Sequence, residues 1–284
     1  MSLLTEAVQV EFGGREPWPQ DVTLYQTDPD THILLPDYAS CLGVKAFLHM
    51  CGLNFQTKCR TNAAHMSPSG KMPFVRVGPM IVSEFEPIVT FVLTKGHHLS
   101  ADSDEIQKAE IRAYISLVDG VLGNAELYIT WYDPTIADEI TKPRFGSPYP
   151  WPLNRIIPWI SQRSELQKLK TLGWAEKPFD QVCDEVTSCC AALSEKLGNQ
   201  DFFFGNKPTE LDASVYGHLY ALLTTDLPNK QLPKIIGEHQ NLIDFCRRVD
   251  SNYFNGSHST SLETSLQLSQ EWEDVQAPTE SGDT

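Results

Sequence analysis

The sequence predicts a two-domain protein, with a small α+β domain at the N-terminal end and an all-α domain after it. The chain has 284 residues, enough for two domains at about 150 residues each. Apolar residues switch between strand and helix periods up to Gly96, and keep a helical period after Asp104. The apolar content of 41% is ordinary for a globular chain and supplies a sizeable core.

The first domain, expected at 21–97, follows an N-terminal arm at 1–20. Its predicted elements are a strand at 22–26, a helix at 39–51, strands at 55–59, 73–77 and 80–84, and a helix that ends at Gly96. The last two strands flank Gly78-Pro79, which favours a tight antiparallel hairpin. The predicted order is therefore βαβ followed by ββα.

The second domain is expected at 102–254 and should contain helices only. Its apolar-periodic segments lie at about 103–132, 154–172, 178–197, 209–224 and 239–254. Thr209-x-x-Asp212 has the capping-box pattern, in which side chains satisfy free amides of the first helical turn. We therefore expect Thr209 and Asp212 to have a structural role at a helix start.

One proline stands out in the run SPSGKMPFVRVG. Pro73 begins a predicted strand directly after a turn, where a proline removes no ladder donor that the sheet needs. Either a trans or a cis Met72-Pro73 bond is compatible with that position. An X-Pro bond makes the cis form accessible, because it costs only about 0.5 to 1 kcal/mol more than trans.

The element order, Pro73 and the Thr209/Asp212 box together resemble the glutathione transferases. The resemblance implies a thioredoxin-like N-terminal domain, an all-helical glutathione-transferase-like C-terminal domain and a cis Pro73. In transferases the turn before the next helix reads Glu/Gln-Ser-x-Ala-Ile, and its serine binds glutathione. Here the register set by Ile88 gives Glu84 and Phe85. A phenyl ring donates no hydrogen bond, so we expect a degenerate glutathione site.

The residue that activates glutathione is also hard to find. Tyr25, Tyr38, Ser40 and Cys41 lie in the right part of the chain. Cys41 is the strongest chemical candidate, because a thiol at a helix N-terminus can become nucleophilic. However, aligning Val44-Lys45 with the Val-Arg pair of transferases places Tyr38 at the nucleophile position. We expect no catalytic residue, no cofactor and no enzyme activity, with a glutathione-dependent transferase or thiol reductase as the alternative.

Charge and composition exclude several other functions. The net charge of −15 argues against nucleic-acid binding and against adhesion to anionic lipid. The seven cysteines form no C-x-x-C pair and the eight histidines do not cluster, so we expect no metal site. Cys189-Cys190 lies in a helical pattern, which favours buried thiols over a redox pair. We also expect no secretory signal, transmembrane helix or lipid anchor.

Longer segments carry a closer resemblance, to the metaxin family in its second type, which has no hydrophobic C-terminal anchor. They are SPSGKMPFVRVG, IVSEFEPIVTFVLTKGHHLS, GSPYPWPLN, PTELDASVYGHLYALLTT and LIDFCRRVDSNYF. The resemblance implies a peripheral protein on the cytosolic face of the mitochondrial outer membrane. It implies two partners, a membrane-anchored metaxin-1-type protein and the β-barrel core subunit of the sorting and assembly machinery, which imports and assembles β-barrel proteins. It extends to the cristae-organising complex and to motor adaptors.

Two further expectations concern surfaces. Tyr149, Trp151 and Trp159 lie in a proline-stiffened stretch and are candidates for partner binding, with burial inside the fold as the alternative. We expect attachment to the membrane only through protein partners, without direct insertion. The tail at 255–284 holds ten Ser or Thr and six acids, which favours disorder, while Thr260-x-x-Glu263 offers a short docking helix as the alternative.

Overall fold

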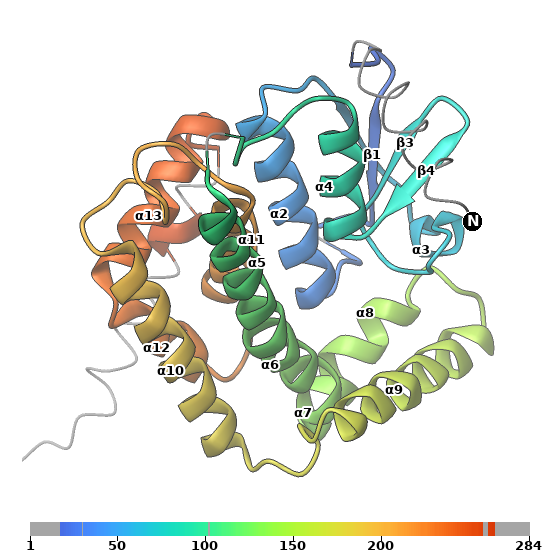
Figure 1. Ribbon diagram of the computed structural model, residues 1–284. Coiled ribbons are helices and arrows are strands. Elements are labelled where there is room, and N and C mark those ends of the chain that lie inside the picture. Colours follow the sequence, from blue (N-terminus) through green and yellow to red (C-terminus); the bar gives the residue numbers. More distant parts are fainter. Residues whose placement is uncertain (1–17, 30, 102, 258–260, 265–284) are drawn as a thin grey trace, which may run out of the picture.

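Figure 1 shows the computed structural model of the chain, which describes residues 18–29, 31–101, 103–257 and 261–264. A small sheet with its helices occupies one side, and a larger group of helices the other. This is a glutathione-transferase-like fold, with a thioredoxin-like N-terminal domain and a helical C-terminal domain. Most of the predicted N-terminal arm, residues 1–17, lies outside the described part of the chain.

The first domain is built on a four-stranded mixed sheet in the order β2-β1-β3-β4. Its elements are β1 (Thr23–Gln26), α2 (Leu35–Met50), β2 (Gln56–Cys59), α3 (Ala63–Met66), β3 (Phe74–Val77), β4 (Met80–Ser83) and α4 (Phe85–Thr94). β1 runs parallel to β2 and antiparallel to β3, and β3 and β4 form the predicted hairpin. Helix α2 begins four residues before the predicted 39, since Pro36 fits the first turn of a helix.

Strand alternation gives the sheet two apolar faces. Leu24 and Val75 belong to the main core. Tyr25 and Phe74 point to the other face, where their rings stack at 4.8 Å and form a smaller cluster with Ala63 of α3 and with Met72. Successive side chains of a strand face opposite sides, so neighbours in sequence serve different cores.

The second domain is helical throughout its described length. Its elements are α5 (Glu105–Val118), η1 (Asp119–Gly123), α6 (Asn124–Leu127), η2 (Tyr128–Tyr132), α7 (Pro134–Ile136), η3 (Ala137–Thr141), α8 (Lys142–Gly146), α9 (Leu153–Thr171), α10 (Phe179–Leu197), α11 (Glu210–Thr224), α12 (Gln231–Gly237) and α13 (Gln240–Tyr253). The first four form the long helix predicted at 103–132, interrupted by the π-helical turns η1 and η2. The short helices α7, α8 and α12 have no counterpart in the prediction.

The two domains meet where α2 packs against α11. Gly217 of α11 is essential there, because a Cβ on it would lie 2.4 Å from the carbonyl oxygen of Ala39 and 2.6 Å from the nitrogen of Gly43. One continuous core contains residues of both domains, from Leu24 of β1 to Val249 of α13. The domains therefore form one packed unit, with a cleft beside the α2–α11 contact.

The described part of the tail differs from the expected disorder. Residues 261–264 are helical, and Leu262 is buried in the main core. Arg247 Nε of α13 donates to Glu263 Oε1 at 2.8 Å. Because a buried leucine and an ion pair hold this turn, it belongs to the folded domain. Thr260, the predicted cap, and residues 265–284 lie outside the described residues.

Candidate functional site: the interdomain cleft and the outer face of α9

A cleft of about 640 Å³ lies between the two domains. The start of α2, the turn before β3 and the start of α4 form one wall. The region from η1 to α9, together with α11, forms the other. The cleft is therefore a candidate site for ligand binding or catalysis.

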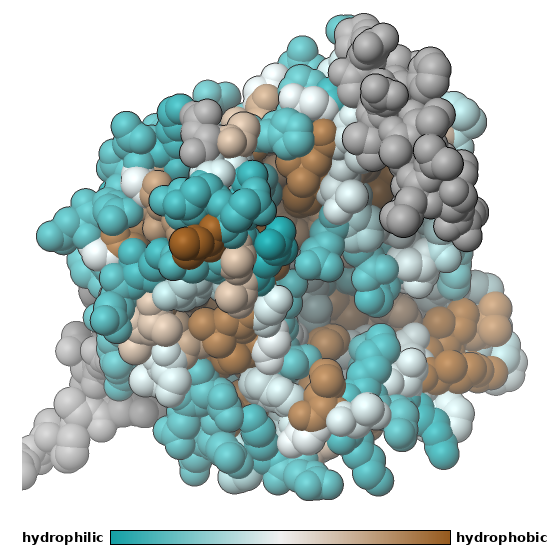
Figure 2. All heavy atoms as spheres, viewed as in Figure 1, coloured by the Kyte–Doolittle hydropathy of each residue, from teal (hydrophilic) through white to brown (hydrophobic). Residues whose placement is uncertain are grey.

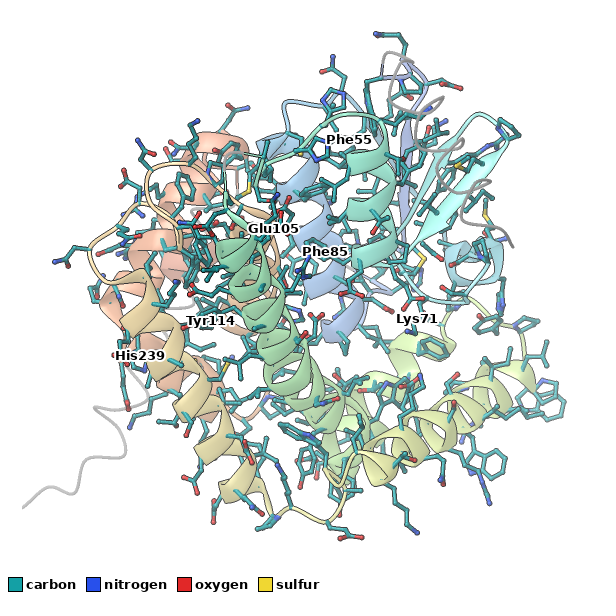
Figure 3. All side chains as sticks on the ribbon, in the orientation of Figure 1. Phe55, Lys71, Phe85, Glu105, Tyr114 and His239 are labelled. Atoms are coloured by element: carbon teal, nitrogen blue, oxygen red, sulfur yellow. The ribbon has the colours of Figure 1, made fainter. Side chains whose placement is uncertain are left out.

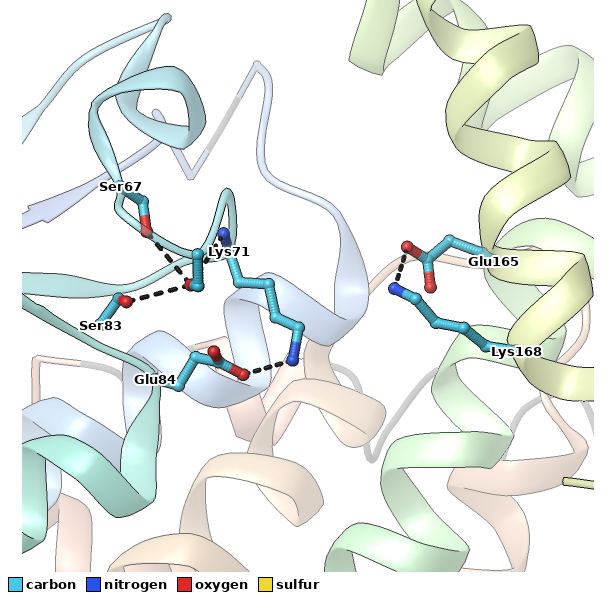
Figure 4. Close-up of polar contacts among 7 residues, drawn as sticks. Ser67, Lys71, Ser83, Glu84, Glu165 and Lys168 are labelled. Atoms are coloured by element: carbon cyan, nitrogen blue, oxygen red, sulfur yellow. Dashed lines mark hydrogen bonds and ion pairs between the residues drawn. The ribbon is translucent and has the colours of Figure 1, made fainter. Parts of the chain in front are cut away.

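Two ion pairs face each other across this cleft (Figure 4). Lys71 pairs with Glu84 on the thioredoxin-like side, and Lys168 Nζ donates to Glu165 Oε1 at 2.6 Å on the α9 side. A third polar group, Ser83, hydrogen-bonds Ser69 at 3.0 Å between their hydroxyl oxygens. The lysines and the serine are thus already engaged with neighbouring side chains.

Glu84 and Phe85, the residues predicted to form a degenerate glutathione site, lie at the start of α4. Phe85 is its first residue, and its ring packs against Phe47 of α2 at 6.1 Å and lies over Gly43. Figure 3 shows Phe85 at the base of α4, beside α2. The ring borders the cleft on one side and a second groove of about 670 Å³, between α4 and α5, on the other. A ring in this position offers no donor to a carboxylate.

Glu84 is held in an unusual backbone conformation directly before Phe85. Its φ of 73° and ψ of 155° lie where residues with a side chain are rarely found. Its N–H donates to the carbonyl of Pro73 at 3.0 Å, and the Met72–Pro73 peptide bond is cis. The carboxylates of Glu84 and Glu86 both line the cleft beside the first turn of α4. Their negative charges would repel an anionic ligand at this helix start.

The candidate nucleophiles are scattered by the fold. Tyr25 is buried against Phe74, and Tyr38 is half-buried beside the cores. Cys41 is 1% exposed, and burial raises the pKa of its thiol far above the ordinary value. Ser40 lines the cleft. Since a reactive cysteine needs an accessible thiolate, Cys41 is inert in this structure.

Two half-buried titratable groups, Asp37 and His218, lie in the cleft wall. Burial, and then Glu165, raise the pKa of Asp37 to about 7 against the opposing effect of Lys168. His218 of α11 contacts Glu126 at 2.8 Å and Asp119 at 3.4 Å. Burial lowers the pKa of His218, but the two carboxylates outweigh it and raise the pKa, so we treat the ring as protonated. The sequence gives only the helical position of His218, and its partners come from a helix about 90 residues away.

The remaining structural residues lie at the base of the helical domain. Asp212 is buried and accepts hydrogen bonds from the N–H and the hydroxyl of Thr209, both at 2.7 Å, and from the N–H of Phe203 at 2.9 Å. Burial raises the pKa of Asp212 to about 6. Cys189 and Cys190 are buried thiols in α10. None of these residues lines the cleft, so they serve the fold.

A second feature lies outside the cleft, on the solvent side of α9. Trp151 and Trp159 are 80% and 55% exposed. Tyr149 is half-buried, and its hydroxyl lies 2.7 Å from His65 Nε2. Of the three aromatic residues predicted for partner binding, two are therefore exposed and one is tied to the first domain. Figure 2 shows apolar side chains over the N-terminal part of α9, at the right-hand edge of the view.

Aliphatic side chains that were not predicted from the sequence extend this surface. Leu153, Ile156 and Ile160 are each between 44% and 54% exposed. We call the exposed side chains Trp151, Leu153, Ile156, Trp159 and Ile160 the α9 surface. Exposed clusters of this kind are unusual on monomeric proteins, so the α9 surface is a candidate interaction site. The helical wheel of 154–172 could have shown it, because these side chains lie away from the buried Pro158 and Leu169.

Among the described residues, no helix is long and apolar enough to cross a membrane. Over the same residues, no three His, Cys, Asp or Glu side chains are grouped as metal ligands would be.

Comparisons with known proteins agree on the fold and on a closer relationship. Glutathione S-transferase family models match residues 39–136 with the N-terminal domain and 186–249 with the C-terminal domain. Metaxin-2 from Homo sapiens is 50% identical, over 89% of this chain and 97% of its own length. The metaxin-2 homolog from Caenorhabditis elegans is 35% identical, over 78% of this chain and 95% of its own.

More distant proteins are similar in sequence or in fold. Metaxin-1 from Mus musculus is 29% identical, over 69% of this chain and 64% of its own length. A glutathione S-transferase structure from Actinobacillus pleuropneumoniae superposes with a TM-score of 0.51 at 11% identity, over 89% of this chain and 93% of its own. At that identity the superposition speaks for the fold alone.

Proposed function

The chain belongs to the metaxin family, and from this premise we propose that it is a non-catalytic subunit of the sorting and assembly machinery on the cytosolic face of the mitochondrial outer membrane. There it would act in the import and assembly of β-barrel proteins. Family membership supports a mitochondrial role, since relatives named metaxin-2 match it over nearly their whole length.

One observation carries the non-catalytic part of this proposal. In the register set by Ile88, Phe85 corresponds to the glutathione-binding serine of the transferases, and its ring packs on Phe47. Two further observations support it: the thiol of Cys41 is buried with a raised pKa, and Lys71 is engaged with Glu84. A transferase needs a site for glutathione and a group that favours the glutathione thiolate. Phe85 offers no hydrogen bond for the first, and the buried thiol of Cys41 is unsuited to the second.

We infer the partners from the family. They are a membrane-anchored metaxin-1-type protein and the β-barrel core subunit of the machinery, with the cristae-organising complex and motor adaptors as further candidates. Metaxin-1 proteins are themselves similar to this chain. Partners with related folds are able to bury matching surfaces, as related subunits commonly do in oligomers.

A glutathione-dependent transferase or thiol reductase is the competing function. The observation in its favour is the cleft itself, which keeps a volume of about 640 Å³ and has Ser40 on its wall. Six acids and three basic residues also line it: Asp37, Glu84, Glu86, Asp119, Glu126 and Glu165 against Lys71, Lys168 and His218. Glutathione has two carboxylates, and this acidic lining disfavours it.

The deciding experiment combines two measurements on the full-length chain. A tagged chain purified from detergent-solubilised mitochondria should bring down a metaxin-1-type protein and the β-barrel core subunit. The purified chain should show no saturable heat with glutathione in calorimetry and no conjugation or thiol transfer above the buffer rate. Glutathione-dependent turnover that is lost in a Ser40→Ala variant would establish the enzyme instead, and purification without either partner would contradict the assembly role.

A further inference from the structure

The α9 surface combines exposed apolar side chains with an unusual distribution of charge. Residues 142–172, which contain α8 and α9, carry six Lys or Arg and one acid. The rest of the chain holds the other 16 of 22 basic residues and 36 of 37 acidic residues. A strongly acidic protein thus has one strongly basic segment, and that segment bears the exposed tryptophans.

The basic residues are available on the outer side of α9. Arg155, Arg163 and Lys170 are exposed and have no acidic partner among the residues that the structure describes. The single acid, Glu165, lines the interdomain cleft and pairs with Lys168. In the part of the chain that the structure describes, no carboxylate pairs with these three residues of the outer face of α9.

Basic and apolar side chains lie on the same side of this helix. Trp159 and Ile160 follow Ile156 by three and four residues, and Arg163 follows them by four and three, which places all of them on one face at 3.6 residues per turn. The guanidinium of Arg163 lies 5.7 Å from the centre of the Trp159 ring, so one cation sits directly beside the tryptophan. The buried side of α9 contains Pro158 and Leu169.

We propose that the α9 surface lies flat on an anionic lipid bilayer, with its Trp, Ile and Leu side chains in the interfacial layer and its Arg and Lys side chains on the lipid phosphates. Tryptophan prefers the membrane–water interface, and a helix with an apolar face and flanking basic residues binds in the plane of the bilayer. Charge complementarity selects this occupant, since an anionic surface attracts a helix with unpaired cations.

The net charge of −15 does not oppose this arrangement. Electrostatic interactions at physiological ionic strength are screened over a Debye length of about 8 Å. A bilayer in contact with α9 therefore responds to the basic residues beside it more than to acids on the far side of the molecule. This proposal departs from the expectation that membrane attachment needs protein partners alone, and it assigns Trp151 and Trp159 to lipid.

The lipid contact complements the proposed function and does not depend on it. One weak membrane signal gives only reversible binding, whereas two signals together give stable attachment. The α9 surface would supply one signal, and the membrane-anchored partner the other. Binding of the purified chain to vesicles tests the lipid contact with no partner present.

The experiment is flotation of the purified full-length chain with vesicles. We expect binding to vesicles of phosphatidylcholine mixed with phosphatidylserine, at least roughly tenfold weaker binding to phosphatidylcholine alone, and loss of binding in high salt. A Trp151→Ser/Trp159→Ser variant and an Arg155→Gln/Arg163→Gln/Lys170→Gln variant should each lose the binding. Exposed residues elsewhere provide matched controls, and both Ile106→Ser and Lys58→Gln should bind like wild type.

A second measurement tests whether Trp151 and Trp159 enter the bilayer. Brominated lipid should quench tryptophan fluorescence in wild type, and a Trp151→Phe/Trp159→Phe variant should lose that quenching while its other tryptophans remain. The proposal is overturned if anionic vesicles fail to bind the chain or if the α9 variants bind them as wild type does. It is also overturned if these variants keep vesicle binding and lose a protein partner from solubilised mitochondria, which would make the α9 surface a protein interface.

Discussion

Asp37 shows how a side chain acquires a property that its sequence does not reveal. It lies in the first turn of α2, an ordinary place for an acid. The fold half-buries it in the cleft wall beside Glu165 and Lys168 of α9. Loss of solvent, and then Glu165, raise the pKa of its carboxyl from 3.8 to about 7, against the opposing effect of Lys168. These partners lie more than 120 residues away, so sequence reasoning had no means to find the site.

This raised pKa makes stability depend on pH. The folded state holds the Asp37 proton more tightly than the unfolded state, whose pKa is near 3.8. The stability that protonation provides is complete below about pH 4 and is lost as the pH rises to 7, by at most about 1.4 kcal/mol per pH unit. Asp37→Asn carries no such charge, so its stability relative to wild type should increase over that window and level off above it.

Urea denaturation of both proteins between pH 4 and 8 measures this difference. The exposed Asp180→Asn serves as a control, since it also replaces one carboxylate by an amide. A constant difference for Asp37→Asn would show that its carboxyl does not titrate in this window.

The positions of Glu84 and Phe85, unlike the surroundings of Asp37, could be predicted from the sequence. Glu84 and Phe85 lie at the start of α4 as their register with Ile88 implies, because a hairpin followed by a helix fixes that register locally. The backbone conformation of Glu84, with φ of 73°, could not be foreseen. It arises from the junction of β4 and α4, where no local pattern calls for glycine.

At the scale of elements, the α2–α11 contact joins the two domains through glycines. A Cβ at Gly217 would meet backbone atoms of Ala39 and Gly43 at 2.4 to 2.9 Å. Backbone cannot rotate away as a flexible side chain can, so Gly217→Ala must push the helices apart. We expect it to lower the free energy of unfolding by about 3 kcal/mol.

Gly120→Ala is the matched control, since a Cβ at Gly120 meets nothing within 4 Å. In its helical setting the control should be neutral or stabilising by up to about 1 kcal/mol. Thermal and urea denaturation of both variants provide the comparison. Equal stability of the two variants would show that α2 and α11 are not packed as closely as described.

The long elements were predictable because their apolar periods are long. α10 and α11 have the predicted extents to within one or two residues. The short helices α7, α8 and α12 have three to seven residues, too few for an apolar period to stand out. The π-helical turns η1 to η3 leave no recognisable pattern, since each adds only one residue to a helical turn.

At the scale of the whole molecule, one core unites two domains that are distinct in topology. We expect a single cooperative unfolding transition for the full chain. Separation between residues 96 and 104 should give fragments that aggregate, because each would expose its side of the α2–α11 contact. Two soluble fragments that unfold cooperatively by themselves would contradict this.

Charge is where reasoning from the whole sequence was least informative. The total of −15 suggests a surface that avoids anionic lipid, but the fold places Arg155, Arg163 and Lys170 on the outer face of α9. A net charge averages over such an arrangement, and only the placement of α8 and α9 shows which face carries which sign.

The central claim is that this metaxin-family chain supports β-barrel assembly without catalysis. The most direct measurement is the rate at which a labelled β-barrel precursor assembles in mitochondria depleted of the chain and then supplied with variants. We predict slow assembly after depletion, and equal rescue by wild type and by a chain with Tyr38→Phe, Ser40→Ala and Cys41→Ser, provided that this chain is folded. Unchanged assembly after depletion would contradict the assembly role, and failure of the folded variant to rescue would contradict the absence of catalysis.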